Sequence, residues 1–164
     1  MNTLERRQIS TPYGPAILAG DHSEDGFVLT AWGWGTFEGK QSTHPVLVEA
    51  ERQSEEYFEG KRHTFDVPLV KSATPFQQKL RQAMIDIPFG GVKTYGELAH
   101  EIGSAPRAIG QGCGRNPIPV IVPCHRVVGQ GGSLVGYSLN GTPNQEGLTM
   151  KAALVTQEQR ELLS

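Results

Sequence analysis

Apolar and polar residues alternate along the first part of the chain with the period of two that half-buried strands show. The alternation covers residues 6–34 and breaks at Pro12 and Gly14, which favour a turn between two strands. After the acidic turn DHSEDG, the run GFVLTAWGW is again rich in strand-forming residues. We therefore expect short strands joined by tight turns in this region.

A helical period replaces the alternation over residues 44–59. The approximate apolar face of this helix consists of Leu47, Ala50, Tyr57 and Phe58. The following segment, HTFDVPLV, predicts another strand, and KSAT reads as a linker. We place a domain boundary in this linker, so that residues 1–72 form an N-terminal α+β domain and residues 73–164 form a C-terminal domain.

The second half predicts three helices. Thr74 can cap the first, with Pro75 in its first turn and the Gly90-Gly91 pair beyond its end. Thr94 and Glu97 form a capping box that opens a second, short helix.

The second helix should stop at Gly103, and Ser104 is expected to cap the third, which carries Pro106 near its start. Two short helices joined by a tight glycine turn are typical of the helix-turn-helix motif, although many globular proteins contain helix pairs.

The composition is that of a soluble globular protein, with 37% hydrophobic and 20% charged residues among 164. The N-terminus, MNTLERRQIS, lacks the apolar core of a signal peptide, and no apolar run approaches the ~18 residues of a membrane span. We therefore expect a cytoplasmic protein, associated with the nucleoid, or a nuclear one in a eukaryote.

The net charge of −2 is unevenly distributed. Residues 1–74 carry 7 basic and 11 acidic side chains, and residues 75–164 carry 8 basic and 6 acidic ones. Nucleic-acid binders often show a strong basic footprint, which this sequence lacks. Any contact with DNA is expected to be local and of modest affinity.

The chain has two cysteines, Cys113 and Cys124, too few for the disulfide framework of a small secreted protein. A zinc site needs ligands at suitable spacing, which neither the cysteines nor His22, His44 and His63 provide. We expect two reduced thiols and no metal.

Cys124 lies in NPIPVIVPCHRVVG, where the prolines exclude a regular helix and the apolar residues indicate burial. It is either a small buried hydrophobe or a nucleophile. A thiol is mostly protonated at neutral pH and becomes reactive when a base or a positive environment favours the thiolate. His125 is the candidate base, directly or through a water; the alternative is a hydrogen-bonded core histidine.

The segment NPIPVIVPCHRVVG resembles the active-site signature of the O6-alkylguanine-DNA alkyltransferases, or methylated-DNA–protein-cysteine methyltransferases. The similarity extends over most of the chain, to TPYGPAILAG, EEYFEGKRHTFDVPL, TPFQQKLRQAMIDIPFGGVKTYGELAHEIG and RAIGQGCGRNP. It implies an α+β protein: a ribonuclease-H-like α/β domain followed by a winged-helix domain with a helix-turn-helix.

The resemblance also implies a function, the direct reversal of DNA damage by a protein that acts once. An alkyl group, usually methyl, would pass irreversibly from O6 of guanine, or less readily from O4 of thymine, to Cys124 after base flipping. The chemistry fits, because a thiolate is a good nucleophile for such a soft electrophile and the thioether product is not readily hydrolysed. The expected partner is double-stranded DNA containing O6-alkylguanine, bound in its minor groove by a monomer without a cofactor.

The family pattern assigns catalytic roles. His125 resembles the base that polarises Cys124 through a water, and Asn116 resembles the asparagine that braces the turn before the cysteine. Tyr95 resembles the tyrosine that helps to rotate the nucleotide and donates a proton to the leaving guanine; the alternative is a half-buried core tyrosine. Arg107 resembles the arginine that enters the duplex and offsets part of the cost of extruding a base; the alternative is an ordinary phosphate contact.

The remaining assignments concern the base pocket and the DNA. The carbonyls of Cys124 and Val127 would accept the exocyclic amine of the guanine, while Tyr137 and Ser138 form the lip of the pocket, with Ser138 near O6. The glycines of the third helix would permit close approach to the minor groove, and Cys113 of the same helix is expected to be a packing residue. The other residues assigned to substrate or DNA are Thr94, Gly110, Gly112, Cys113, Gly114 and Arg115.

A carboxylate usually orients a catalytic histidine. Spacing alone does not choose among Glu146, Glu158 and Glu161, but aligning GLTMKAALVTQE with the family pattern G-L-x-x-K-x-x-L favours Glu158. Against this, TQEQ reads as a new capping box at Thr156, which would turn the chain.

Two further departures concern loops. The turn GSAPR between the DNA-binding helices is shorter than the turn of the family pattern. The segment SLNGTPNQEGL is longer than its counterpart in that pattern, and its extra loop, 139–147, could widen or cover the pocket.

Two other functions stay open. A damage-sensing protein would bind alkylguanine without transferring the alkyl group, although relatives of that kind lack the cysteine. A cysteine hydrolase would use Cys124 and His125 with turnover, but the sequence shows no recognisable oxyanion hole.

Overall fold

The computed structural model describes residues 3–132, 138–139, 142–143 and 145–163 of this mixed α+β chain. Contacts divide the chain into two units, Met1–Val70 and Lys71–Ser164. None of the helices in the described residues is long and apolar enough to cross a membrane.

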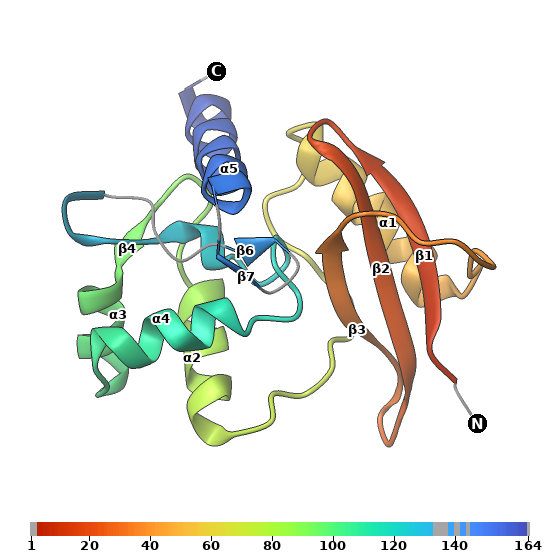
Figure 1. Ribbon diagram of the computed structural model, residues 1–164, viewed down its shortest axis with the longest axis horizontal. Coiled ribbons are helices and arrows are strands. Elements are labelled where there is room, and N and C mark those ends of the chain that lie inside the picture. The colour runs from red at the N-terminus through yellow and green to blue at the C-terminus, as the bar shows by residue number, and fades with distance from the viewer. Residues whose placement is uncertain (1–2, 133–137, 140–141, 144, 164) are drawn as a thin grey trace. The chain divides into compact units, whose positions relative to one another are not determined.

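The first unit is a three-stranded antiparallel sheet with one helix across a face (Figure 1). Its elements are β1 (Glu5–Thr11), β2 (Gly14–Ser23), β3 (Gly26–Trp34) and α1 (Pro45–Phe58), and the strand order is β1-β2-β3. The strands predicted over residues 6–34 and the helix predicted over residues 44–59 are thus confirmed. Gly14 has φ 122°, a conformation that favours glycine, in the turn that the sequence indicated.

The core of this unit lies between the sheet and α1. Leu47, Ala50 and Tyr57 are fully buried, as the apolar face predicted, whereas Phe58 at the end of the helix is half-buried. The indole of Trp32 donates to Ser54 Oγ at 3.2 Å, so this buried polar pair is satisfied.

The predicted strand HTFDVPLV does not form. Only an isolated parallel bridge joins Leu69 to Leu29, in which Leu29 N–H donates to the Pro68 carbonyl at 2.8 Å and Val70 N–H donates to the Leu29 carbonyl at 2.9 Å. Pro68 has no N–H with which to extend a ladder.

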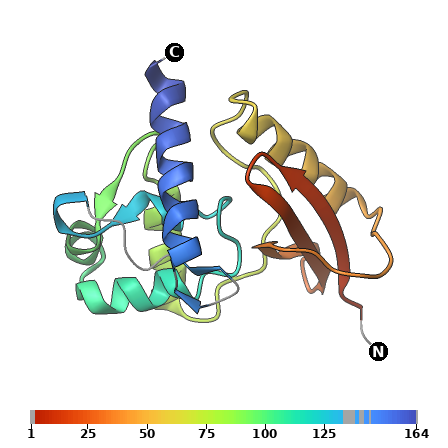
Figure 2. The same ribbon diagram turned by 45° about the horizontal axis from the view of Figure 1, so that its top comes forward.

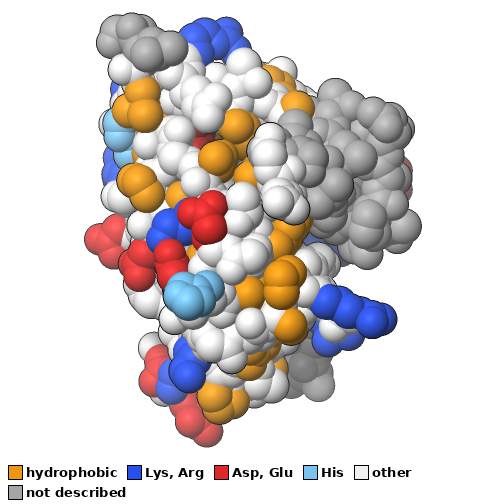
Figure 3. Space-filling view, turned by 90° about the vertical axis from the view of Figure 1, so that its left-hand side faces the viewer, with side chains coloured by type: hydrophobic (Ala, Val, Ile, Leu, Met, Phe, Trp, Pro, Cys, Tyr) orange, Lys and Arg blue, Asp and Glu red, His pale blue; other side chains and the backbone are white. Residues whose placement is uncertain are grey.

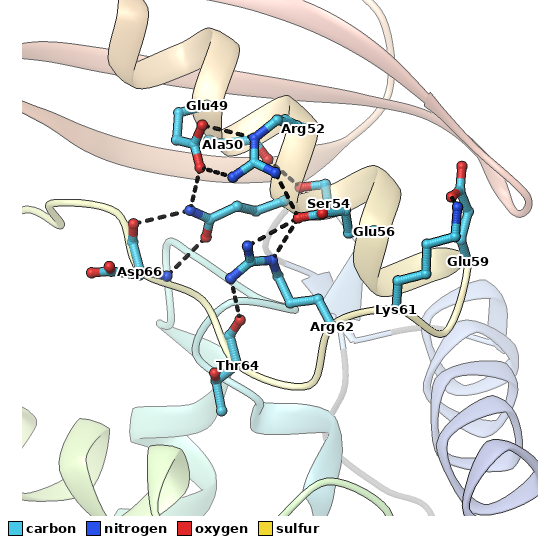
Figure 4. A network of polar contacts seen from close by, with 11 residues as sticks. Glu49, Ala50, Arg52, Ser54, Glu56, Glu59, Lys61, Arg62, Thr64 and Asp66 are labelled. Atoms are coloured by element: carbon cyan, nitrogen blue, oxygen red, sulfur yellow. Dashed lines mark hydrogen bonds and ion pairs between the residues drawn. The ribbon is translucent and has the colours of Figure 1, made fainter.

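Side chains take over the backbone groups of this segment (Figure 4). Gln53 of α1 donates to the Asp66 carbonyl at 3.1 Å and accepts from the Asp66 N–H at 2.8 Å. Arg62 donates to the Thr64 carbonyl at 3.1 Å and forms an ion pair with Glu56 at 2.9 Å. An extended segment is therefore anchored to the helix, which explains why a strand-like sequence does not become a strand.

The second unit contains short elements and one long helix. They are α2 (Pro75–Ile85), β4 (Lys93–Thr94), α3 (Tyr95–Ile102), α4 (Pro106–Gly114), the 3-10 turns η1 (Cys124–Arg126) and η2 (Gln130–Gly132), β5 (Val127–Val128), β6 (Ser138–Leu139), β7 (Thr142–Pro143) and α5 (Gln145–Leu163). β4 and β5 pair in parallel, and β6 and β7 pair antiparallel.

The helix caps follow the sequence closely. Thr74 Oγ1 accepts from Gln77 N–H at 3.1 Å, and the capping box of Thr94 and Glu97 has both of its hydrogen bonds. Gly103 ends α3 with φ 70°, in the left-handed conformation that favours glycine there.

Ser104, in contrast, does not cap α4. The N-cap is Ala105, which makes no side-chain capping bond. The N–H of Ser104 donates to the Ala99 carbonyl at 2.8 Å, so Ser104 completes the end of α3, and Pro106 then takes the first position of α4.

α5 is one unbroken helix through Thr156, so the capping box read at TQEQ is wrong as a break (Figure 2). The predicted loop 139–147 includes strand residues of β6 and β7 and the first turn of α5.

The anchoring role of Gln53 is testable in the first unit. Gln53→Ala removes both hydrogen bonds to Asp66 and should lower the free energy of unfolding by about 1–3 kcal/mol, because two part-buried hydrogen bonds that anchor the segment to α1 are lost. Both tryptophans lie in β3, so fluorescence during denaturant unfolding reports on this unit. The exposed Glu55→Ala on the same helix serves as control and should change stability by less than about 0.5 kcal/mol. Equal effects of the two substitutions would contradict the anchor.

Candidate active site

Asn116 braces the turn that carries Cys124. Its Nδ2 donates to the Val122 carbonyl at 2.8 Å and its Oδ1 accepts from the Ile118 N–H at 3.0 Å, so one side chain joins the two ends of the buried segment. The N–H of Cys124 donates to the same Val122 carbonyl at 2.8 Å. Cys124 therefore begins η1 from a backbone whose path is fixed by hydrogen bonds.

The segment is also strained at one position. Val120 has φ 73° and is, among the described residues, the single non-glycine residue with positive φ. A β-branched residue in this region costs of order 1–3 kcal/mol and persists only where its surroundings enforce it. Val120 is almost fully buried, together with Ile118 and Val122, and this packing provides the enforcement.

Cys124 is a buried thiol, 6% exposed. Burial raises its pKa above the ordinary value, although a hydrogen bond from Asn116 and the positive charge of Lys151 act in the opposite direction. The resting residue is therefore protonated at neutral pH and needs a base for reaction.

His125, Glu158 and Arg126 form a buried hydrogen-bonded cluster. His125 Nε2 lies 2.8 Å from Glu158 Oε2, and their side chains are 0% and 1% exposed. Arg126 holds the same carboxylate in a bidentate manner, with Nε 2.9 Å from Oε1 and Nη2 3.0 Å from Oε2. Its Nη1 donates to the Ile87 carbonyl at 2.8 Å, and the guanidinium lies 5.7 Å from the ring centroid of Phe89.

The charges in this cluster follow from its geometry. Burial alone would raise the pKa of Glu158, but hydrogen bonds from His125 and Arg126 outweigh it and hold that pKa well below its ordinary 4.5. Burial lowers the pKa of His125 below 6.5, against the opposing effect of Glu158. At neutral pH the carboxylate is ionised and the imidazole is neutral, and Nε2 therefore carries the proton.

The second ring nitrogen of His125 is the basic one. Nδ1 is buried and forms no hydrogen bond within the part of the chain that the structure describes. A neutral histidine with a free lone pair, held at its other nitrogen by a carboxylate, is the arrangement of a general base.

Tyr95 and Lys151 form a second polar pair in this unit. Lys151 Nζ donates to Tyr95 Oη at 3.3 Å and lies 5.5 Å from the ring centroid. Burial, with smaller contributions from the charges of Cys113 and Cys124, raises the pKa of Tyr95, so the phenol stays protonated. The electrostatic influence of both sulfurs indicates that Tyr95 lies in the same region as Cys124.

The sequence interpretation did not assign a role to Lys151. It used this residue only as the lysine of the pattern that aligned Glu158. Lys151, Leu154 and Glu158 recur at helical spacing, and all three are 0–1% exposed. A lysine on the inner face of a predicted helix was the available signal.

The predicted DNA-contacting helix α4 has an open face and a packed face. Arg107 is exposed near its start, and Arg115 is exposed at its C-cap. A Cβ added at Gly110 or Gly114 would meet no atom within 4 Å, whereas one at Gly112 would lie 2.3 Å from Leu80 Cδ2. Gly110 and Gly114 thus lie on the open face, and Gly112 lies on the packed face against Leu80.

Cys113 does not belong with the DNA-contacting residues. It is buried, its thiol lies 3.7 Å from Met84 Sδ, and burial raises its pKa to about 12. Its environment is that of a packing residue, because it lies on the packed face of α4 and not on the open face.

Four other residues were assigned to the site from the sequence. The Thr94 hydroxyl is engaged in the α3 cap, and the N–H of buried Val127 donates to the Cys124 carbonyl, which leaves that oxygen one further acceptor position. Tyr137 lies outside the described residues, and Ser138 is described only through the backbone of β6.

The surface has no continuous basic stripe on the face shown in Figure 3, where lysine and arginine side chains are interspersed with acidic ones. Lys93 and Glu101 form an ion pair. Among the described residues, no three His, Cys, Asp or Glu side chains are grouped as metal ligands would be.

Known proteins are similar to this chain in sequence and in fold. Residues 75–160 match the family model of the 6-O-methylguanine DNA methyltransferase DNA-binding domain. The constitutive methylated-DNA–protein-cysteine methyltransferase of Bacillus subtilis (strain 168) is 42% identical over 136 residues, with 78% of this chain and 82% of that protein covered. The Mycobacterium leprae methylated-DNA–protein-cysteine methyltransferase is 36% identical over 168 residues, with coverages of 96% and 94%. The solved structure of Mycobacterium tuberculosis OGT in complex with DNA has a TM-score of 0.78 and 40% identity, with coverages of 96% and 94%.

The cluster around Glu158 makes a prediction about stability. Glu158→Gln leaves the Arg126 guanidinium buried without a counter-charge, which should cost about 3–5 kcal/mol. Hydrogen exchange of the α5 amides reports on the second unit. The exposed Glu101→Gln serves as control and should cost less than about 1 kcal/mol.

The same cluster predicts acid sensitivity. Because the folded-state pKa of Glu158 is depressed, its contribution to stability is present above about 4.5 and is lost as the pH falls from there toward the folded-state pKa. The Glu158→Gln protein should lack this component of the pH dependence. An identical acid profile in both proteins would contradict the assignment of an ionised Glu158.

Proposed function

Because this chain belongs to the methylated-DNA–protein-cysteine methyltransferase family, we propose that it repairs DNA by moving an alkyl group from O6 of guanine to its own Cys124. The observation that carries this proposal is the buried series Cys124, His125 and Glu158, in which a protonated thiol is followed along the chain by a neutral histidine that an ionised carboxylate holds. The similarity to a DNA-bound relative supports DNA as the partner.

The reaction follows from these protonation states. His125 Nδ1 takes the thiol proton, through a water, and the Cys124 sulfur attacks the alkyl carbon. The sulfur–carbon bond forms as the carbon–O6 bond breaks, and the electron pair of that bond passes to the guanine ring. Tyr95 donates a proton to the ring and regains one from solvent, while His125 releases the thiol proton to solvent. The net change is one proton lost by the thiol and one gained by the guanine.

The product explains why the protein would act once. A thioether is a poor leaving group, and no step in this site returns the alkyl group to water. The buried position of Cys124 also fits a single-use residue. A protonated thiol with a raised pKa reacts slowly with other electrophiles before the alkylated guanine enters the pocket.

DNA binding is assigned to α4. The open faces of Gly110 and Gly114 permit close approach of the helix backbone to the minor groove, and Arg107 supplies the side chain that replaces the extruded base. We further propose that the protein works as a monomer at the nucleoid or in the nucleus, and that the first unit is a ribonuclease-H-like domain.

The proposal is tested by peptide mass analysis after the protein is mixed with excess duplex containing O6-methylguanine. Cleavage after basic residues separates NPIPVIVPCHR, which contains Cys124, from AIGQGCGR, which contains Cys113. One methyl on the first peptide, saturating at one per protein and abolished in Cys124→Ser, is expected. Tight binding to the lesion without methylation of either peptide would mean a damage sensor, and repeated turnover would mean a different reaction.

Arg107→Ala separates base flipping from chemistry. Extruding a base costs a few kcal/mol, and losing the side chain that offsets part of this should slow repair of duplex by about tenfold or more. Reaction with the free base O6-methylguanine should be unchanged within about twofold, since no base must be extruded.

Arg115→Ala, at the other end of α4, is the matched control. It should weaken DNA binding without slowing repair at saturating duplex. Equal losses of Arg107→Ala on duplex and on free base would remove the flipping role.

A further inference from the structure

A tight turn over residues 88–91 connects α2 to β4 and lies beside α5 (Figure 2). The N–H of Gly91 donates to the Pro88 carbonyl at 2.9 Å and closes the turn. Gly90, at the third position, has φ 83°, which a type II turn requires and which glycine adopts readily. The reaction described above does not use this turn.

The first residues of this segment hold the cation of the buried cluster. The N–H of Ile87 donates to the Met84 carbonyl at 3.1 Å, which fixes the segment to the end of α2. The carbonyl of Ile87 accepts from Arg126 Nη1 at 2.8 Å, and the ring of Phe89 lies 5.7 Å from the guanidinium carbon. The path of the segment therefore determines where the guanidinium is held.

Gly90 contacts the helix that supplies the carboxylate. Its N–H donates to Glu158 Oε1 at 3.5 Å, a long hydrogen bond. A Cβ added at Gly90 would overlap Leu162 Cδ1, and it would lie 2.8 Å from Leu162 Cγ and 3.6 Å from the Glu158 carbonyl oxygen. Glu158 and Leu162 are four residues apart, so they lie on the same face of α5. A side chain at position 90 would therefore occupy space that this face already fills.

The same glycine meets two separate demands. The turn needs a residue that tolerates positive φ, whatever lies nearby. Gly103 at the end of α3 meets this demand alone, because it has φ 70° and an added Cβ there would meet no atom within 4 Å. Gly90 combines the same demand with the contact to α5. A comparison of the two glycines therefore separates the shape of a turn from the position of the helix.

We propose that Gly90 is a positioning residue for His125, because its lack of a side chain lets α5 approach closely enough for Glu158 to hold the imidazole. The carboxylate lies 2.8 Å from His125 Nε2, which leaves Nδ1 as the basic nitrogen. Misplacing a reacting group by about 1 Å can slow a reaction by about a hundredfold. The use of the imidazole as a base rests on the proposed function, whereas the contact between Gly90 and α5 does not.

The first test reads the imidazole nitrogen shifts of His125 in folded protein and needs no substrate. Gly90→Ala should weaken the preference for a proton on Nε2, because the displaced α5 carries Glu158 away from the ring. Adding Leu162→Ala should restore the wild-type shifts, because it removes the atoms that the new methyl group meets. Gly103→Ala, which introduces the strain of positive φ without a contact, should keep the wild-type shifts.

The second readout is single-turnover methyl transfer from the free base O6-methylguanine, which excludes effects on DNA binding. Gly90→Ala should slow it by about tenfold or more, because the base is misplaced. The double variant with Leu162→Ala should return toward the wild-type rate. Leu162→Ala alone, at a side chain that is 53% exposed, and Gly103→Ala should each stay within about twofold of wild type.

Three outcomes would overturn the proposal. The first is a folded Gly90→Ala protein with the wild-type shifts and rate. The second is an equal effect of Gly90→Ala and Gly103→Ala, which would assign the effect to backbone strain. The third is a loss in Gly90→Ala that Leu162→Ala does not reverse, which would assign the effect to the turn and not to the approach of α5.

A further measurement decides the matter if Gly90→Ala does not fold. In wild-type protein, a nuclear Overhauser effect between a Gly90 Hα and a Leu162 methyl group is expected, and its absence would overturn the proposal. Folding of the double variant where Gly90→Ala does not fold would support the close approach. If wild-type protein transfers no methyl group, the proposed function fails, while the shifts of His125 still decide whether Gly90 positions Glu158.

Discussion

The buried pairing of Glu158 with both Arg126 and His125 is the interaction on which the rest of the site depends. The carboxylate comes from α5 and its two partners from η1, so a single ionised group fixes the long helix to the turn that carries Cys124. Arg126 supplies the compensating charge. Because the cluster is already neutralised, His125 does not have to be a cation, and burial keeps it neutral.

The neutral state of His125 determines the protonation state of the resting site. The same burial that raises the pKa of Cys124 lowers that of His125, so the resting state is a protonated thiol followed along the chain by a neutral histidine rather than an ion pair. Such a thiol is protected from reagents in solution, which suits a residue that can be used once. Cys113 shows how burial alone affects a thiol. Its sulfur lies against Met84 Sδ, and burial raises its pKa to about 12.

Local chemistry explains which parts of the fold the sequence could predict. The capping box of Thr94 and Glu97, the Thr74 cap and the Gly103 terminus each depend on residues only a few positions apart, and all of them form. Ser104 was misassigned because a carbonyl of the preceding helix holds its N–H. The strand predicted at HTFDVPLV failed because side chains of α1, distant in sequence, bind its backbone.

The features of the site also differ in whether local sequence could predict them. The motif around Cys124 was recognisable from residues alone, and the choice of Glu158 came from a family pattern rather than from spacing. The strain at Val120 and the burial of Lys151 were not predictable, because both depend on packing between segments that meet only in the fold. Cys113 was included among the residues assigned to substrate or DNA because it lies in α4. Its contacts depend instead on which face of α4 it occupies.

The most direct test of this account is the state of His125 in the resting protein, measured by nitrogen chemical shifts of the imidazole across the pH range around 6.5. The account predicts a neutral ring with its proton on Nε2 throughout the neutral range. In Glu158→Gln the ring should stay neutral, because the carboxylate that raises the pKa of His125 is gone, while the preference for a proton on Nε2 should weaken. An imidazolium at neutral pH, or a proton on Nδ1, would contradict the claim that a neutral base activates Cys124.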